Sequence, residues 1–149
     1  MDKTFKYADL VNDLANCPPA DSQEINSNIY RYIFEDENHE NNFKPVLLIK
    51  PARVNHKMFD LDEMKCRGYA LSVYDSLDNS RKAFVNMQKR NKNFGNNVGE
   101  YVAEIAVTSD DGLASAPSNS NTNRGHFDFF EFTETTLRNN IILVEKLRP

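Results

Sequence analysis

The sequence predicts an α+β fold, with a mixed, mostly antiparallel sheet of five or six strands and two main helices. Three observations support this prediction. Several short segments are rich in β-branched and aromatic residues of alternating polarity, which is typical of strands. Two other segments repeat apolar residues at helical spacing. These helical segments do not alternate regularly with the strands, as a doubly wound parallel sheet would require.

The chain is expected to form a single domain that spans residues 1–149. Two independent cores would leave each half of the 149 residues near the lower size limit for folding alone. The ten phenylalanines and six tyrosines are too many large apolar side chains for a disordered chain. We therefore expect one packed core.

Two segments predict helices. In residues 5–16 the apolar side chains follow the spacing of one helical face, and the Cys-Pro-Pro string that follows must end the helix. In residues 77–91 a row containing Leu77, Phe84 and Met87 forms the apolar face. A serine or aspartate just before that row is suited to cap its first turn.

Five segments predict strands, and residues 45–49 predict a short additional one. The acidic residues 35–42 and the small polar residues 113–124 offer little to bury, so both predict mobile loops. The turn residues Asp110 and Asp111 precede the second of these loops. We expect the five main strands at residues 28–34, 69–74, 101–107, 126–132 and 140–146.

The composition argues against several classes of protein. The longest apolar run, residues 141–144, is far shorter than the ~20 residues that span a bilayer. The first residues lack the apolar stretch of a signal peptide. A formal charge of −4 disfavours a broad nucleic-acid surface. We therefore expect a cytoplasmic protein without a membrane association.

The chain contains two cysteines, Cys17 and Cys66. Two cysteines are too few for a disulfide framework or for a four-ligand zinc site. Neither has an activating partner nearby in the sequence, so we expect free buried thiols. The three histidines have no metal-ligand spacing, and we predict no metal site.

Arg31 stands inside an otherwise apolar and aromatic strand, where alternation places it between Ile29 and Ile33 on one face. A buried charge is costly unless it is paired and hydrogen-bonded. One interpretation is that its planar guanidinium reaches an anionic ligand, such as a phosphate or a carboxylate. The alternatives are a position in solvent or an internal ion pair with an acidic side chain: Asp75, Asp128 or Glu131.

Two further segments carry candidate functional residues. Ser72 lies inside a strand just before a capped helix, where ligands often meet the ends of sheets, although backbone bonding would also satisfy its hydroxyl. Residues 126–132 combine four phenylalanines with His126 and Glu131. This segment is either a core strand or one side of a cleft with Arg31. Burial among the phenylalanines would raise the pKa of Glu131, as a catalytic acid or base requires.

A series of short strings runs through most of the chain. Its members are Cys17-Pro18-Pro19, Tyr30-Arg31, Phe43, Pro45, Cys66, Gly68-Tyr69-Ala70-Leu71-Ser72 and Gly125-His126-Phe127. The series resembles a group of small bacterial proteins to which no activity is assigned. That resemblance implies a component of a mobile or conflict-type gene cluster.

A second resemblance rests on the order of elements: Tyr30-Arg31, a strand with Ser72, the helix at 77–91, the strand at 101–107 and Glu131. This order resembles that of ADP-ribosyltransferases and RES-type NAD-consuming toxins. The resemblance implies that Tyr30 and Arg31 bind the dinucleotide and its phosphates, and that Ser72 supports the nicotinamide ribose. Glu131 would bind a ribose hydroxyl and stabilise the developing oxocarbenium ion. Those enzymes carry Glu-x-Glu or Gln-x-Glu where this chain has an Asp-Phe-Phe-Glu string.

We predict a small cytoplasmic protein-interaction module, or an accessory component of a bacterial defence-type system, that binds another protein without a cofactor. The alternative is an ADP-ribosyltransferase-like or NAD-hydrolysing enzyme. That enzyme would bind NAD in a cleft formed by Arg31, Ser72, His126 and Glu131. Convergence of Arg31, Ser72 and Glu131 in one pocket would favour the enzyme, and positions on different faces would favour the module.

Overall fold

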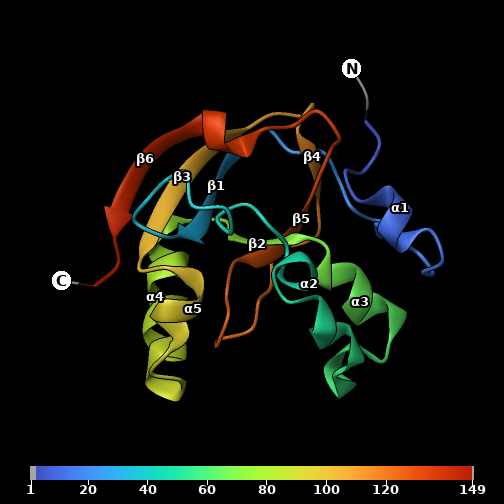
Figure 1. Ribbon diagram of the computed structural model, residues 1–149. Helices are drawn as coiled ribbons and strands as arrows, with labels where there is room; N and C mark the ends of the chain where they lie inside the picture. The colour runs from blue at the N-terminus through green and yellow to red at the C-terminus, as the bar shows by residue number, and fades with distance from the viewer. Residues whose placement is uncertain (1–2, 149) are drawn as a thin grey trace.

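The computed structural model describes residues 3–148, which form a six-stranded antiparallel sheet with its helices gathered along one side (Figure 1). The α+β class predicted from the sequence is therefore confirmed. The strand order is β4-β5-β2-β1-β3-β6. The strands are β1 (Ser27–Ile33), β2 (Leu71–Tyr74), β3 (Tyr101–Val107), β4 (Gly112–Ala114), β5 (His126–Glu131) and β6 (Ile141–Lys146).

The longest helix is α4 (Leu77–Arg90), and it agrees with the helix predicted at residues 77–91. The side chain of Ser76 caps it by accepting a hydrogen bond from the backbone N–H of Asn79 at 3.1 Å. The other helices are short: α1 (Ala8–Val11), α2 (Val46–Ile49), α3 (Asp62–Gly68) and α5 (Phe94–Val98), with 3₁₀ turns η1 (Pro51–Asn55), η2 (Lys57–Phe59) and η3 (Leu137–Asn140).

Two sequence predictions are corrected here. The helix expected over residues 5–16 is the single turn of α1. Before it, Phe5 forms a β-bridge with Phe132, and after it, Asn16 adopts a left-handed conformation with φ of 55°. The strand expected at 45–49 is helix α2 instead. Pro45 caps its start in an extended conformation, and a short apolar run has no periodicity that separates strand from helix.

Cys17 and Cys66 form a disulfide bond, which contradicts the prediction of two free thiols. Their Cα atoms lie 5.6 Å apart although 49 positions separate them in the sequence. The fold brings the loop after α1 against the last turn of α3, and no local feature of the sequence indicates this approach.

The main core packs on the central strands and contains alternating residues of β1, β2, β3 and β5. Ile29 and Ile33 of β1 are fully buried, as the alternation pattern predicts. A smaller cluster packs the N-terminal segment against α3 and β5. Its buried members are Phe5, Val11, Cys66, Ala70 and Phe130.

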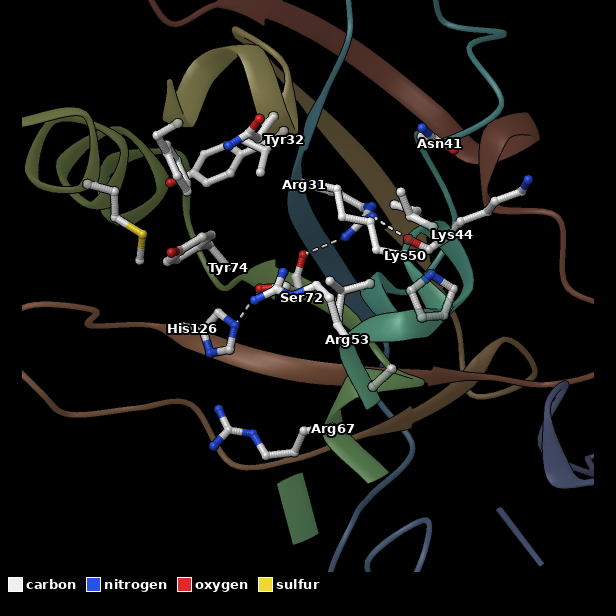
Figure 2. Close-up of a pocket in the computed structure, with 18 of the residues that line it drawn as sticks. Arg31, Tyr32, Asn41, Lys44, Lys50, Arg53, Arg67, Ser72, Tyr74 and His126 are labelled. Atoms are coloured by element: carbon white, nitrogen blue, oxygen red, sulfur yellow. Dashed lines mark hydrogen bonds between the residues drawn. The ribbon is translucent and has the colours of Figure 1, made fainter. Parts of the chain in front are cut away.

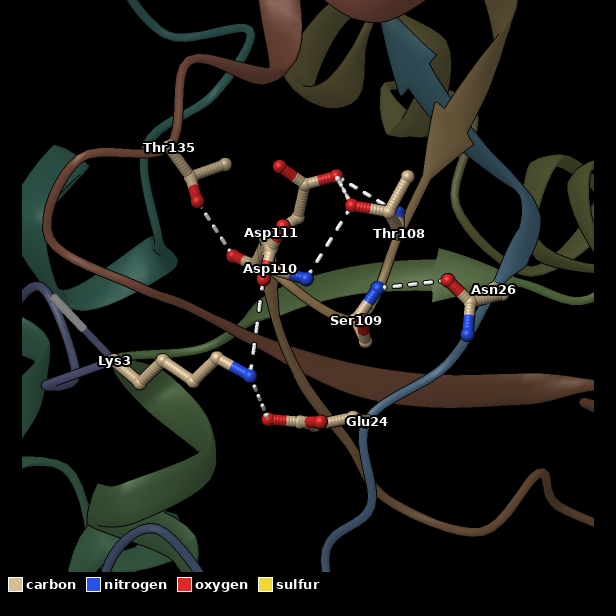
Figure 3. Close-up of polar contacts among 8 residues, drawn as sticks. All are labelled: Lys3, Glu24, Asn26, Thr108, Ser109, Asp110, Asp111 and Thr135. Atoms are coloured by element: carbon tan, nitrogen blue, oxygen red, sulfur yellow. Dashed lines mark hydrogen bonds and ion pairs between the residues drawn. The ribbon is translucent and has the colours of Figure 1, made fainter. Parts of the chain in front are cut away.

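The predicted turn before β4 is confirmed and is fixed by polar contacts (Figure 3). The Asp111 carboxylate accepts hydrogen bonds from the backbone N–H and the hydroxyl of Thr108, at 2.8 and 3.4 Å. Lys3 lies between two carboxylates, 2.9 Å from Glu24 and 3.8 Å from Asp110. This network joins the start of the chain to the sheet.

Strand β1 meets its two neighbours very differently. It pairs with β3 along its whole length, from Ser27 opposite Val107 to Ile33 opposite Tyr101. Within residues 3–148 its pairing with β2 is limited to Tyr30 opposite Tyr74. The sheet is therefore continuous on one side of β1 and loosely joined on the other.

Helices α2 to α5 form two groups on the same side of the sheet, and α1 lies apart from both (Figure 1). One group contains α2, the 3₁₀ turns η1 and η2, and α3, and the other contains α4 and α5. Across residues 3–148, no helix has the length and apolar character that crossing a bilayer requires.

Candidate functional site

A pocket of about 320 Å³ lies between the two helical groups, with β1, β2 and β5 at its floor (Figure 2). Residues of α2, η1 and α3 line one side, and residues of α4 and α5 line the other. The described residues that carry its chemistry are Arg31, Tyr32, Lys44, Lys50, Arg53, Arg67, Ser72, Tyr74, Phe94, Asn123 and His126.

Three of the four residues predicted to be catalytic line this pocket: Arg31, Ser72 and His126. Ser72 and Tyr74 are separated by one residue on β2, so both side chains point to the same face. His126 lies directly opposite Tyr74 on β5, and therefore shares that face. This register brings together residues that are 54 positions apart in the sequence.

Ser72 and His126 form a close polar pair. The Ser72 hydroxyl lies 2.5 Å from Nε2 of His126. The imidazole ring packs edge-on against Tyr74, with ring centroids 5.5 Å apart. Burial lowers the pKa of His126, while the charges of Asp128 and Arg67 act in opposite directions. His126 is therefore neutral at pH 7 and is able to accept the Ser72 proton.

Arg31 fills the gap where β1 and β2 separate. Its Nη1 donates to the backbone oxygen of Ser72 at 2.9 Å. In a fully paired ladder, a backbone N–H of β1 would donate to this oxygen instead. Its Nε and Nη2 donate to the backbone oxygens of Asn42 at 2.6 Å and Lys44 at 3.3 Å. The guanidinium thus joins β2 to the loop after β1, and both Nη atoms keep an N–H for a ligand.

The charge of Arg31 has no close counter-ion. Within residues 3–148 no carboxylate lies within ion-pair distance of it, so the internal ion pair considered for Arg31 is absent. Burial lowers the pKa of Arg31 to about 10, and the more distant charges of Glu131 and Tyr7 raise it. At pH 7 the guanidinium is charged and only partly compensated by carbonyl dipoles.

One wall of the pocket is strongly basic. Lys44, Lys50 and Arg53 line it from the segment that contains α2 and η1, and Arg67 lines it from α3 (Figure 2). No aspartate or glutamate is among the described lining residues. Such a field attracts an anion and raises the local concentration of anionic ligands.

Sequence reasoning missed these four cations. A signal exists for three of them, because residues 43–59 contain Lys44, Lys50 and Arg53, together with Lys57, but no acidic residue. The run is not a dense basic patch, and its meaning depends on α2 and η1 folding back beside the sheet.

The opposite end of the pocket is aromatic. Tyr32 contacts Tyr74 and Phe94 with ring centroids 5.4 and 5.8 Å apart, and its hydroxyl donates to the backbone oxygen of Ser80 at 2.6 Å. Burial raises the pKa of both tyrosines, so their phenols stay neutral. These rings offer flat surfaces to a planar ligand group.

Asp128 is the carboxylate next to the floor of the pocket. It lies directly opposite Ser72 in the β2–β5 ladder and therefore shares the face of Ser72 and His126. Its Oδ2 accepts a hydrogen bond from Nε of Arg67 at 3.0 Å. Burial raises the pKa of Asp128, whereas the charges of Arg67 and His126 lower it.

Glu131 and Tyr30 do not line the pocket. Glu131 alternates to the other face of β5, where its side chain is 3% exposed and its Oε2 lies 3.1 Å from Nζ of Lys6. The predicted increase in its pKa agrees in direction with its burial. The Tyr30 hydroxyl instead donates to Glu104 of β3 at 3.1 Å.

The loop before β5 closes one corner of the pocket. The hydroxyl of Tyr74 donates to Oδ1 of Asn123 at 2.6 Å. At the base of the loop, the backbone N–H groups of Ser118 and Gly125 donate to His126 and Ser118, each at 2.8 Å. Gly125 has φ of 82°, and a Cβ there would collide with the Asp75 carboxylate.

No cluster of three or more His, Cys, Asp or Glu side chains within residues 3–148 is arranged to hold a metal ion. In comparisons with known proteins, no family model, curated protein or solved structure matches this chain. The geometry of the pocket therefore carries the functional argument.

Proposed function

We propose that this protein binds a nicotinamide dinucleotide in the pocket between the two helical groups and cleaves its nicotinamide–ribose bond, in the manner of an ADP-ribosyltransferase-like or NAD-hydrolysing enzyme. The supporting observation is the pocket's two-ended character. Cations line one end, from Arg31, Lys44, Lys50 and Arg53, with no carboxylate among the lining residues of the described chain, and aromatic rings form the other end.

This layout matches a pyrophosphate joined to flat heterocycles. The basic wall would hold the two phosphates, with Arg31 donating from its remaining N–H groups in a planar fork. Tyr32 and Tyr74 would pack against a planar ring. The volume of about 320 Å³ holds part of a dinucleotide, and the rest would extend along the open side of the pocket.

The reaction needs a negative group near the ribose, where positive charge develops as the C–N bond breaks. We assign this role to Asp128, because it shares a face with Ser72 and His126 while Glu131 does not. The nicotinamide leaves with the bonding electrons, and water or a hydroxyl acceptor forms the new bond to the ribose and loses a proton. Neutral His126 is positioned to accept that proton through Ser72.

Calorimetric titration with NAD and ADP-ribose tests the binding step. Lys50→Gln is expected to weaken ADP-ribose binding by about three- to tenfold. Lys57→Gln is the matched control, because Lys57 is an exposed lysine of the same segment that does not line the pocket. Failure of either nucleotide to bind the parent protein would reject the proposal.

Release of nicotinamide from NAD, followed by chromatography, tests the reaction. Asp128→Asn is expected to lower the rate by about 100-fold or more, since it removes the charge facing the developing cation. A comparable loss confined to Glu131→Gln would return the carboxylate role to Glu131. Tight binding without nicotinamide release in the parent protein would leave a dinucleotide-binding module.

The interaction-module hypothesis has a separate supporting observation at the edge of the sheet. Strand β6 is the last in the sheet order, and its Ile142 and Leu143 are 58% and 48% exposed. An edge with unpaired backbone groups and exposed aliphatic side chains is suited to pair with another strand. We propose a second copy of this chain as the occupant, paired antiparallel through β6.

Sedimentation equilibrium across a wide concentration range tests that pairing. The parent protein is expected to dimerise, and Leu143→Lys is expected to be monomeric because a charge would enter the apolar edge. A parent protein that stays monomeric at all concentrations would contradict it.

The cytoplasmic location and the defence-type context are separate proposals. The Cys17–Cys66 bond weakens the first, since disulfides persist mainly in oxidising compartments. Fractionation of the native host, with trapping of free thiols, tests the location directly. The defence-type context rests on the sequence resemblance alone.

A further inference from the structure

The Cys17–Cys66 disulfide is directly connected to the basic wall of the pocket. Cys66 is 1% exposed in the last turn of α3, and the next residue, Arg67, lines the pocket. Arg67 also donates to Asp128 on β5, the carboxylate that we propose stabilises the positive charge on the ribose. Two residues after α3 the chain enters the pocket floor at Ala70 and β2.

The partner of Cys66 belongs to a loosely held segment, residues 7–22, which we call the strap. The chain is anchored just before the strap, where the N–H of Lys6 donates to Glu131, and just after it, where Gln23 pairs with Ala114. Among the hydrogen bonds of the described residues, the N–H of Ala8 donates to the nearby backbone oxygen of Phe5, and one further bond joins the strap to a distant part of the protein. It runs from the N–H of Ala15 to Asp62 of α3 at 2.9 Å and is exposed.

Apart from that bond, the strap is held by the disulfide and by a small apolar cluster. Val11 and Cys66 belong to the cluster, and Leu14 and Cys17 pack against it. Helix α3 is itself short, and its Gly68 packs so closely on Leu47 and Phe59 that a Cβ there would collide with Leu47. Among the described residues, the side-chain hydrogen bonds of α3 to other elements are those of Arg67 to Asp128 and of Asp62 with the strap. The disulfide is thus the covalent member of the small set of contacts that position α3.

We propose that the redox state of the Cys17–Cys66 pair regulates ligand affinity at the pocket, because the bond holds Arg67 in the basic wall. This inference rests on the proposed anion-binding function. Reduction transfers two electrons and two protons from a dithiol to the disulfide, giving two thiols and oxidised dithiol. The freed strap then leaves α3 and Arg67 more mobile, and ligand binding has to order them.

Titration of the full chain with ADP-ribose, before and after treatment with dithiothreitol, tests the proposal. Reduction is expected to weaken binding by about five- to tenfold. Amide hydrogen exchange in residues 62–70 should become faster in the same samples. The Cys17→Ser variant is expected to bind ADP-ribose like the reduced protein, and dithiothreitol should not change its affinity.

Arg67→Gln is the decisive matched variant. If Arg67 carries the effect, its oxidised and reduced forms should differ in affinity by less than about twofold. Equal affinities of the oxidised and reduced parent protein would overturn the redox proposal and leave the binding function intact. Absence of ADP-ribose binding in both states would overturn the two proposals together.

Circular dichroism of each sample separates a change in the pocket from unfolding. Retained secondary structure with weakened binding supports regulation. Loss of structure in both the reduced parent protein and Cys17→Ser would overturn it, because the bond would then be needed for folding and not for tuning the pocket.

Discussion

The two sides of β1 show how one strand serves both the fold and the candidate site. On the β3 side, the ladder is complete and Ile29 lies opposite Ile105, both fully buried. On the β2 side, the ladder within residues 3–148 is limited to Tyr30 opposite Tyr74. The guanidinium of Arg31 replaces the backbone partner of the Ser72 oxygen. On the β3 side, ladder bonds satisfy the backbone groups of β1. On the β2 side, the guanidinium of Arg31 takes the place of ladder bonds, and this charged group also lines the pocket. The incomplete side is therefore the one where function is expected.

The largest effect is expected on the complete side. Ile105→Ala should lower the free energy of unfolding by about 2–5 kcal/mol, because it leaves a cavity in a site with no exposure. Urea denaturation measures the loss. Ile142→Ala on the neighbouring strand β6 is the control, since its side chain is 58% exposed and should cost less than about 0.5 kcal/mol. Similar losses in both variants would mean that the core does not lie on this side of the sheet.

A smaller stability effect but a larger binding effect is expected at the incomplete side. Arg31→Met should lower the free energy of unfolding by about 1.5–3 kcal/mol, since three backbone oxygens lose a charged donor. It should also remove measurable ADP-ribose binding. Arg31→Lys keeps the charge without the fork and should weaken binding while costing less stability.

Urea denaturation beside calorimetry separates these effects. If the Arg31→Met variant is less stable but binds ADP-ribose as the parent protein does, the role of Arg31 is structural alone.

Glu131 provides a pH test on the face of β5 opposite the pocket. Burial raises its pKa above the usual 4.5; Lys6 and then Arg31 oppose this, and Asp111 adds to it. The folded state thus holds the proton more tightly than the unfolded state. The resulting stability is present below about pH 4.5 and is lost as pH rises through the raised pKa.

Glu131→Gln is neutral at every pH and should flatten this decline. Urea denaturation of both proteins between about pH 4 and 8 gives the comparison. A parent protein whose stability rises across this range, relative to the variant, would contradict the assigned direction.

The smallest effect is expected at His126. Its lowered pKa makes it neutral at pH 7, so it gains a proton only under more acidic conditions. Affinity for ADP-ribose, whose diphosphate does not titrate in this range, should rise a few-fold as pH falls from about 7.5 to 5.5. His126→Asn should lose that rise. An equal rise in the variant would assign it to another group.

Much of the sheet was predictable because its strands carry local patterns. The segments that became β1 and β3 alternate apolar and polar residues, and Ser76 caps α4 as expected. The failures lie where tertiary contacts decide the local structure. Residues 46–49 form a helix between two prolines, and the helix expected at 5–16 is cut short in the segment that the disulfide ties to α3.

The candidate site was predictable in part. Arg31 was singled out as a charge within an apolar strand, and Ser72 and His126 as polar residues near strand ends, and the antiparallel register brings the latter two together. Glu131 was grouped with them although it lies five positions after His126, and the alternation of a regular strand places two such residues on opposite faces. The basic wall depends on a fold-back of residues 44–53 that no sequence period indicates.

The loop before β5 also has a consequence for engineering. Its base is fixed by the bonds between Ser118, Gly125 and His126, and Asn123 is tied to Tyr74. Its tip, residues 119–122, is exposed. Chain length at such a tip is open to change at little cost, because the base already holds the ends together. A peptide tag or reporter inserted between Ser120 and Asn121 should thus lie near the pocket without displacing His126. A fluorophore at this position is suited to report ligand binding.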